Sequence, residues 1–365
     1  MRVLAIVPSV YDTSPGQRFR LEQWEPILRE RGVEITWRAF ENDELHEVLY
    51  QSGNTAGKVR EVVRSFGRRL KNLRDVRDFD VVYVFREAAL LGPAWFEKRI
   101  ARAGVPLIFD FDDAVFVSYK SPSNGYLSYL KFPAKTATIC RLSAHVTAGN
   151  PYLADYARQF NQQVTIIPTT IDTDKYLPEY RMAQPDVPVI GWSGSFSTVQ
   201  HLDTVRGALQ RLAQEENFML RVIGTPVYKL EGVETEAMQW RAASETDDLR
   251  PFDIGLMPLP DDDWSKGKCG LKALQFMALG VPTVCSPVGV NTDIIQDGTN
   301  GMLAATEDEW VEKLRQLLHS PELRVKLGKA GRETVEQKYS AKAIAPKFFE
   351  VLTKVANTDS SSKRK

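Results

Sequence analysis

Short apolar runs alternate with stretches of helical spacing along the first half of the chain. The runs with the length and apolar content of buried strands are residues 3–8, 81–85, 106–111 and 164–168. Helical periodicity appears between them in residues 19–31, 94–103 and 129–143. Strands that alternate with helices in this way predict βαβ units around a parallel sheet.

The alternation stops after residue 168 and starts again at residue 189. Pro178, Pro185 and Pro188 interrupt the polar stretch in between, which indicates an interdomain linker over residues 171–188. The strand-like and helix-like runs that follow are residues 189–192, 198–214, 219–224, 254–258, 271–279, 283–286 and 307–318. We therefore expect an α/β protein with two Rossmann-like, doubly wound domains, residues 1–170 and 189–340.

The C-terminal end has a different pattern. Residues 341–356 have the spacing of one more amphipathic helix, which we expect to pack back toward the first domain. Residues 357–365 are polar and charged, and they cannot bury enough apolar surface to fold. A disordered tail is therefore expected there.

The charge balance and the rare residue types exclude several classes of protein. Lys plus Arg equals Asp plus Glu at 47 each, so we expect no nucleic-acid binding through broad phosphate neutralisation. The three Cys and four His are scattered singly, which fits neither a disulfide framework nor a zinc site. No apolar run reaches the roughly 18 to 20 residues of a membrane span. A cytoplasmic protein with at most peripheral membrane contact is expected.

One segment, residues 58–77, is strongly basic. It holds eight Lys or Arg against two acidic residues, and its apolar residues have helical spacing. Those apolar residues are Val59, Val62, Val63, Phe66, Leu70 and Leu73. The pattern predicts a basic amphipathic helix. Its basic face is either simply solvated or a surface for anionic lipid headgroups or a lipid-linked phosphate.

No phosphate loop, G-x-G-x-x-G, G-x-S-x-G or H-E-x-x-H motif occurs in the sequence. Two strand-to-helix junctions in the second half are instead candidate anion sites. Residues 191–197 form a small polar turn, and residues 266–272 combine two glycines with three lysines. Ligands of parallel sheets bind at the carboxyl ends of the strands, where both turns are expected. The candidate residues are Ser193, Gly194, Ser195, Lys266, Lys268, Gly270, Leu271 and Lys272.

The first half offers a cluster of acids and a short basic turn. Asp110, Asp112 and Asp113 end a buried strand, which is costly unless they face a cleft, bind a cation or cap the next turn. An Asp110-x-Asp112 metal site of the GT-A glycosyltransferase type is one alternative, although the two-domain pattern argues against it. Near Gly16, Arg18 and Arg20 begin a helix, where positive charge opposes the helix dipole. They are either anion ligands or ordinary surface residues.

Residues 266–302 resemble the donor-site signature of family-4 (group 1) retaining glycosyltransferases of the GT-B fold. The motif residues are 270–282, 286–291 and 297–301, and residues 167–172 and 253–258 are similar to two further family segments. The first half resembles the family in layout, with Gly16 at its glycine-rich first loop.

The resemblance implies two domains that face across a cleft, with a nucleoside-diphosphate sugar on the second domain and the acceptor on the first. The implied reaction is a metal-independent, cofactor-free, hexosyltransferase-like transfer to an acceptor hydroxyl with retention. A glycan or lipid-linked acceptor in cell-surface polysaccharide or glycolipid synthesis would fit, at the inner face of the plasma membrane. A sugar-nucleotide epimerase and a non-catalytic sugar-nucleotide-binding protein of the same fold are the alternatives.

The resemblance also assigns roles to single residues. Asp112 stands where many members carry a histidine at the reaction centre, and Lys268 and Lys272 would neutralise the leaving diphosphate. The two family glutamates that contact the sugar and the ribose are replaced here by Gly267 and Gln275. Gln275 can still hydrogen-bond a ribose. The expected donor-binding residues are Gly16, Arg18, Ser193, Gly194, Ser195, Lys266, Gly270, Leu271 and Gln275.

Overall fold

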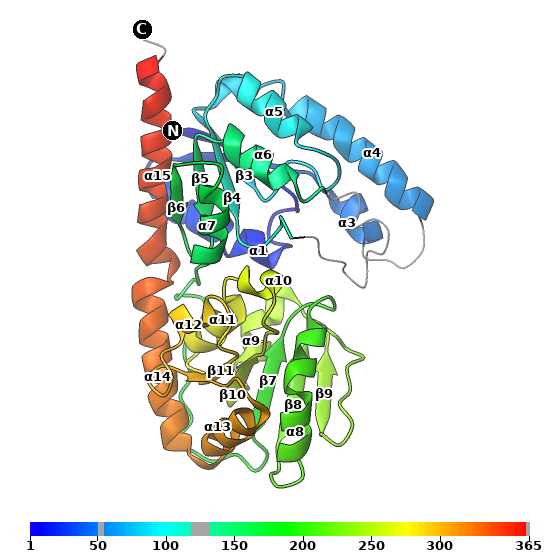
Figure 1. Cartoon of the computed structure of the whole chain (residues 1–365), viewed down its shortest axis with the longest axis vertical. Helices are drawn as coiled ribbons and strands as arrows, with labels where there is room; N and C mark the ends of the chain where they lie inside the picture. The colour runs from blue at the N-terminus through cyan, green and yellow to red at the C-terminus, as the bar shows by residue number, and fades with distance from the viewer. Residues whose placement is uncertain (50–54, 118–131, 363–365) are drawn as a thin grey trace. The chain divides into compact units, whose positions relative to one another are not determined.

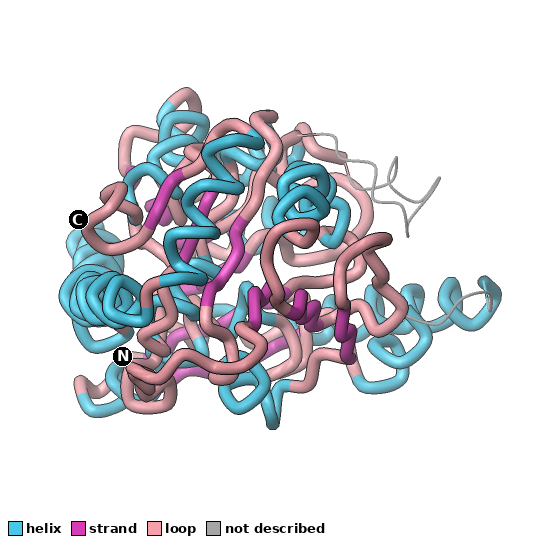
Figure 2. Tube along the Cα trace, turned by 90° about the horizontal axis from the view of Figure 1, so that it is seen from below, coloured by secondary structure: helices cyan, strands magenta, loops and turns pink. Residues whose placement is uncertain are grey.

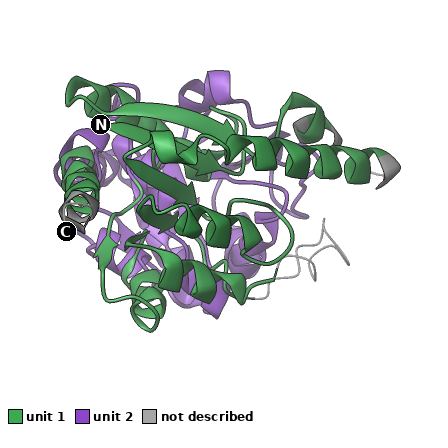
Figure 3. Cartoon of the chain, turned by 90° about the horizontal axis from the view of Figure 1, so that it is seen from above, with its two compact units in different colours: residues 1–169, 344–365 green, residues 170–343 purple. Residues whose placement is uncertain are grey.

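The computed structural model describes residues 1–49, 55–117 and 132–362. The chain divides into two compact units, each built around one parallel sheet (Figure 3). Unit 1 comprises residues 1–169 and 344–365, and unit 2 comprises residues 170–343. Two α/β units of this kind match the fold class that the alternation of strands and helices predicts.

The sheet of unit 1 has six parallel strands in the order β2-β1-β3-β4-β5-β6, of which Figure 1 labels β3 to β6. The strands are β1 (Arg2–Val7), β2 (Glu34–Ala39), β3 (Val81–Phe85), β4 (Leu107–Phe111), β5 (His145–Ala148) and β6 (Val164–Ile166). Because β2 and β3 flank β1 on opposite sides, the chain reverses its direction across the sheet between β1 and β3. Open α/β sheets bind ligands at such a point.

The described residues up to 169 form seven α-helices of this unit: α1 (Pro15–Arg18), α2 (Glu25–Glu30), α3 (Asp43–Leu49), α4 (Thr55–Asn72), α5 (Trp95–Arg102), α6 (Lys135–Leu142) and α7 (Pro151–Arg158). The helix expected over residues 19–31 is shorter, because Pro26 lacks an N–H and favours the first turn of α2. The helix expected over residues 129–143 begins at Lys135, and residues 129–131 lie outside the described residues.

Helix α4 buries only part of the apolar face that its sequence predicts, where Phe66 packs against Phe40 and Phe96 with ring centroids 5.4 and 5.7 Å away. Its exposed residues include Val59, Val63 and Leu70, and its buried residues include Glu61, Ser65 and Arg69. The Arg69 guanidinium explains this orientation, since it donates hydrogen bonds to the carbonyl oxygens of Val7 (2.9 Å) and Arg38 (2.7 Å) at the ends of β1 and β2. Polar anchoring to strand ends therefore leaves an apolar and basic face of α4 exposed.

The sheet of unit 2 has the strand order β12-β11-β10-β7-β8-β9. The strands are β7 (Val189–Ser193), β8 (Met219–Ile223), β9 (Thr235–Met238), β10 (Ile254–Met257), β11 (Thr283–Cys285) and β12 (Met302–Leu303). Here the chain reverses its direction across the sheet between β7 and β10. Helices cover the strands (Figure 2), and the buried apolar cluster includes Trp192, Leu220, Leu256 and Trp310.

The helices of this unit are α8 (Arg206–Leu212), α9 (Glu245–Leu249), α10 (Asp263–Lys266), α11 (Leu271–Ala278), α12 (Asn291–Ile294), α13 (Glu307–His319) and α14 (Pro321–Lys338). The expected helix 198–214 is a 3₁₀ stretch, Val199–Val205, followed by α8. Helix α14 was not predicted, because its inward face carries Gly328 and two buried arginines, Arg324 and Arg332, rather than an apolar stripe. The linker 171–188 contains no helix, and its Ile171 forms a single bridge to Ser340.

The last helix, α15 (Ala341–Ser362), enters unit 1 from residue 344 onward. There Phe348 packs on Trp24 and Tyr83, with ring centroids 5.0 and 5.7 Å away. The helix extends to Ser362, so most of the tail expected to be disordered is helical, because propagation of an existing helix tolerates polar residues. No helix in the described part of the chain is both long and apolar enough to cross a membrane.

Candidate functional site

The two predicted junctions of unit 2 meet at the carboxyl edge of its sheet. Gly194 follows β7, and Lys272 lies in the first turn of α11, after β10. A Cβ atom on Gly194 would lie 2.9 Å from Lys272 Cε and would overlap the Trp192 ring. The glycine therefore allows a lysine to approach the loop at the point where the sheet reverses direction.

Both lysines at this edge lie over aromatic rings. Lys272 Nζ is 5.3 Å from the centre of the buried Trp192 ring, and Lys268 Nζ is 4.6 Å from that of Trp264. An ammonium group is attracted to the face of an aromatic ring, which orients it without neutralising its charge. The two lysines can therefore still attract an anion.

The pKa of His201 responds to the positive charge of these lysines. Burial and the charges of Lys272 and Lys268 together lower the pKa of its imidazole to about 4, whereas Asp262 opposes them. A neutral imidazole therefore lies within electrostatic range of both lysines at neutral pH. Sequence reasoning missed His201, because a single histidine in a helical pattern gives no functional signal.

The N-terminus of α11 offers backbone donors to the same edge. Gly270 precedes the helix with a φ of +73°, and no side chain caps its first N–H groups. A Cβ atom at this position would overlap Ile294, so glycine is required both by conformation and by space. Uncapped N–H groups and the helix dipole favour an anion here, next to Leu271.

The remaining predicted donor residues of unit 2 are more closely tied to their own surroundings. Ser193 is buried at the end of β7, and the Ser195 hydroxyl contacts the Ser197 hydroxyl at 2.9 Å. Lys266 forms an ion pair with Asp261 at 3.1 Å. The structure thus places Ser193 at the end of β7 and Ser195 in the loop after it, whereas Lys266, at the end of α10, is paired with a nearby acid.

Gln275 belongs to a buried hydrogen-bond network that sequence reasoning did not anticipate. Its Nε2 donates to the Tyr176 hydroxyl (2.9 Å), and that hydroxyl donates to Glu245 (2.7 Å). Trp240 donates to the second oxygen of Glu245 at 2.9 Å. The network fixes the Gln275 amide one turn beyond Lys272 on α11. Gly267 ends α10 and contributes no side chain.

At the carboxyl edge of the unit 1 sheet, Asp112 follows β4 and is buried. Arg86, which follows β3, donates from Nε to Asp112 Oδ1 at 2.7 Å and forms an ion pair with Asp113 at 2.9 Å. A Cβ atom on Gly16 would lie 2.9 Å from Asp112 Oδ2. The structure therefore brings Gly16 and Asp112 together, and it adds Arg86, which no sequence pattern indicated.

Arg18 is buried and paired with Asp12 at 2.8 Å, within the loop that follows β1. The anion partner of Arg20 is Asp110, which accepts hydrogen bonds from Arg20 Nε (3.0 Å), Tyr83 (2.6 Å) and Thr147 (2.7 Å). This group is completely buried in the sheet. Asp110 and Arg20 are therefore structural residues, and Arg20 is not a surface residue.

Comparison with known proteins places this geometry in a family. Residues 187–320 match the family model described as "Glycosyl transferases group 1". Sulfoquinovosyl transferase SQD2 of Arabidopsis thaliana is 27% identical over 201 residues, which cover 49% of this chain and 37% of that protein. The family model thus covers less than half of the chain, and residues 187–320 of unit 2 are similar to the group 1 glycosyltransferases. The match spans less than half the length of this relative and of the α-maltose-1-phosphate synthase of Mycolicibacterium smegmatis, of which it covers 42%.

Solved structures show that this chain has the GT-B fold. Sucrose-phosphate synthase from Thermosynechococcus elongatus superposes with a TM-score of 0.70 at 14% identity, over 98% of this chain and 100% of that one. Anabaena HepE in complex with UDP and glucose superposes with a TM-score of 0.68 at 13% identity, over 97% of this chain and 100% of that one.

The alternative of an Asp110-x-Asp112 metal site of the GT-A type is wrong for this chain. Its fold is GT-B, and both oxygens of Asp110 accept hydrogen bonds inside the protein. Among the residues that the structure describes, no group of three His, Cys, Asp or Glu side chains is arranged to hold a metal ion.

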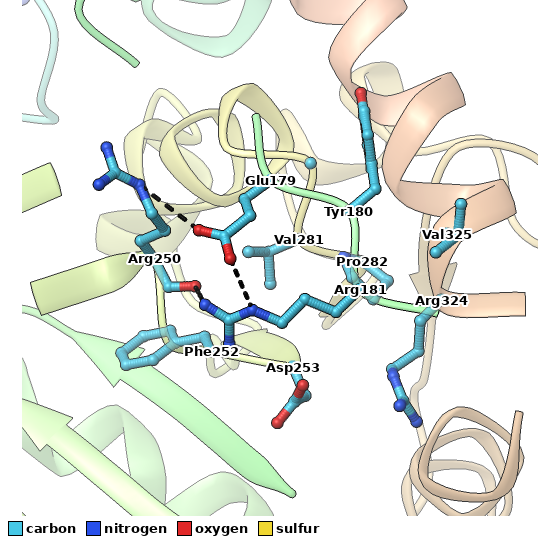
Figure 4. Close-up of a pocket in the computed structure, with 11 residues that line it drawn as sticks. Glu179, Tyr180, Arg181, Arg250, Phe252, Asp253, Val281, Pro282, Arg324 and Val325 are labelled. Carbon is cyan, nitrogen blue, oxygen red and sulfur yellow. Dashed lines mark hydrogen bonds and ion pairs between the residues drawn. The ribbon is translucent and has the colours of Figure 1, made fainter. Parts of the chain in front are cut away.

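A small pocket in unit 2 lies at the opposite, amino edge of the sheet, before β10 and β11 (Figure 4). Arg181 and Arg250 both contact Glu179 there, at 3.0 and 4.0 Å. The cavity of about 20 Å³ has room for about one water molecule. None of the predicted site residues lines it, and it is too small for a sugar nucleotide.

Proposed function

We propose that this chain transfers a sugar from a nucleoside-diphosphate sugar to an acceptor hydroxyl, with retention of configuration and without a metal. One observation carries the proposal: Gly194, the uncapped N-terminus of α11 and the lysines Lys268 and Lys272 converge where the unit 2 sheet reverses direction. This arrangement suits a diphosphate, which needs positive charge and backbone donors in close approach.

The chemistry follows from where charge develops. As the bond between the anomeric carbon and the diphosphate oxygen breaks, negative charge grows on the leaving group, and Lys268, Lys272 and the N–H groups near Leu271 would stabilise it. The acceptor oxygen then bonds to the anomeric carbon, and the proton of the acceptor hydroxyl passes to the departing diphosphate. Asp112 would act at the reaction centre, and the Gln275 amide would bind the ribose.

The named relatives support a hexosyl donor and a cell-surface product. The HepE structure holds UDP and glucose, and the structurally similar WaaG is described as a glycosyltransferase involved in lipopolysaccharide biosynthesis. We extend both points to this chain as part of the proposal. The acceptor would be a glycan or a lipid-linked sugar.

Turnover of a donor panel tests the proposal. Incubation with UDP-, GDP- and dTDP-sugars should release nucleoside diphosphate only when an acceptor is added, and EDTA should leave the rate unchanged. Interconversion of the donor sugar without an acceptor would favour an epimerase instead. Binding without any turnover would favour a non-catalytic binding protein.

The exposed face of α4 supports a peripheral membrane role for unit 1. Val59 and Val63 are 58% and 64% exposed and alternate with the exposed bases Arg60, Arg64 and Lys71. Apolar side chains between bases are typical of helices that dock on anionic lipid headgroups. We propose an anionic leaflet, the inner face of the plasma membrane, as the partner of this face.

Replacement of Arg60, Arg64 and Lys71 by Gln should abolish salt-sensitive binding to anionic vesicles, because each base near an anionic leaflet contributes about 1 kcal/mol. Sedimentation with anionic and zwitterionic vesicles at low and high salt measures this. The same change at Arg206, Arg211 and Lys326 of unit 2, which are also exposed, is the matched control and should have no effect. Equal binding to both vesicle types, or no binding, would contradict this proposal and show that the exposed face of α4 is simply solvated.

A further inference from the structure

Arg86 has an unusual backbone conformation at the end of β3. Its φ is +57°, in the left-handed region that non-glycine residues rarely adopt. Its N–H still donates to the Asp110 carbonyl oxygen at 2.7 Å, so pairing with β4 continues to this residue. A strained residue persists only where its surroundings fix it, and such residues concentrate at functional sites.

The contacts of the Arg86 side chain fix this conformation. One fork of the guanidinium contacts both Asp112 (2.7 Å) and Asp113 (2.9 Å), the first residues after β4. Burial disfavours its charged form, but the two carboxylates outweigh burial and raise the pKa of Arg86 above its ordinary value. A lysine could not hold two acids in this planar way.

The segment that follows β1 lies against the ion pair of Arg86 and Asp112. A Cβ atom on Gly16 would lie 2.6 Å from Arg86 Nη2 and 2.9 Å from Asp112 Oδ2. The loops after β1, β3 and β4 therefore meet at Arg86. Since β1, β3 and β4 are neighbours, this meeting point is where the unit 1 sheet reverses direction and where its ligand is expected.

We propose that Arg86 is a positioning residue for glycosyl transfer, which holds the Asp112 carboxylate at the reaction centre and keeps the Gly16 loop against it. The inference rests on the proposed function and names how the acid of that site is held in place. Arg20 has a different role, because its partner Asp110 lies inside the sheet.

The test compares Arg86→Lys with Arg99→Lys, an exposed arginine of α5 that serves as the matched control. Arg86→Lys should lower kcat at least 10-fold while the Kd of the nucleoside diphosphate product stays within twofold. In an Asp112→Asn background the same change should lower kcat by less than twofold, because Arg86 acts through Asp112. Added guanidinium ion should partly restore the kcat of Arg86→Ala, which a purely structural role does not predict.

Full kcat in Arg86→Lys, or effects that add in the double variant, would overturn the inference. The geometry has its own test that needs no turnover. Gly16→Ala should lower Tm in the wild-type chain and lower it less in an Arg86→Ala background, since the collision with Arg86 Nη2 is then gone and only the close approach to Asp112 Oδ2 remains. A fall in Tm of equal size in both backgrounds would contradict the proposed contact between Gly16 and Arg86. No turnover by the wild-type chain would instead overturn the proposed function.

Discussion

Asp112→Asn should reduce kcat by about 100-fold or more, the usual loss when a positioned acid–base or electrostatic group is removed from a reaction centre. The change keeps the size and shape of the side chain and removes only its charge, so Tm should fall little. Binding of the nucleoside diphosphate should also be unchanged, because we assign its site to unit 2. Steady-state kinetics, calorimetry and thermal melting measure the three quantities.

Asp113→Asn is the matched control for this prediction. Asp113 contacts the same guanidinium but is more exposed, with 18% of its side chain accessible against 8% for Asp112. We expect a loss in kcat of less than about fivefold from Asp113→Asn, well short of the factor for a catalytic group. A large fall in Tm with Asp112→Asn, or equal losses in the two variants, would assign Asp112 a structural role.

Lys272→Ala should weaken binding of nucleoside diphosphates by about 1.5–3 kcal/mol, the range for hydrogen bonds to charged groups. That loss corresponds to a Kd roughly 10- to 150-fold higher. Lys268→Ala should have an effect in the same direction. The affinity for the nucleoside alone should barely change, because the lysine binds only the diphosphate. Isothermal calorimetry with the nucleoside and its diphosphate gives both constants.

Lys329→Ala controls for the removal of a lysine from an aromatic ring. Lys329 Nζ lies 5.6 Å from the centre of the Tyr180 ring, and Tyr180 lines the small pocket at the amino edge of the sheet. Its loss should leave diphosphate affinity unchanged. If both Lys268→Ala and Lys272→Ala bind nucleoside diphosphates with wild-type affinity, these lysines do not bind the diphosphate.

The sequence predicts the elements that bury apolar residues continuously. Strands β1, β3 and β4 are covered on both faces, so they appear as unbroken apolar runs, whereas β2 is only partly buried and was missed. The turns at Gly194 and Gly270 were found because a glycine between a strand and a helix is a local signal. Local signals of this kind locate the edge of the unit 2 sheet.

Contacts between distant segments could not be predicted in the same way. Arg86 meets Asp112 across 26 positions of sequence, and its left-handed backbone leaves no trace in the residue pattern. The orientation of α4 could not be predicted because Arg69 is bound by carbonyl groups of β1 and β2, which hydrophobic periodicity does not encode. Both the contact of Arg86 with Asp112 and the orientation of α4 depend on tertiary hydrogen bonds.

The pKa of His201, followed by NMR while UDP or GDP is added, tests most directly whether a nucleoside diphosphate binds beside Lys268 and Lys272. Without ligand this pKa is about 4. Because negative charge favours the imidazolium, bound diphosphate should raise the pKa, and nucleotide binding should become coupled to proton uptake as the pH falls toward it. His145 of unit 1, whose pKa burial also lowers to about 4, is the internal control and should not respond. An unchanged His201 pKa at saturating UDP and GDP, or a shift at His145 instead, would contradict the assignment of the donor site to unit 2.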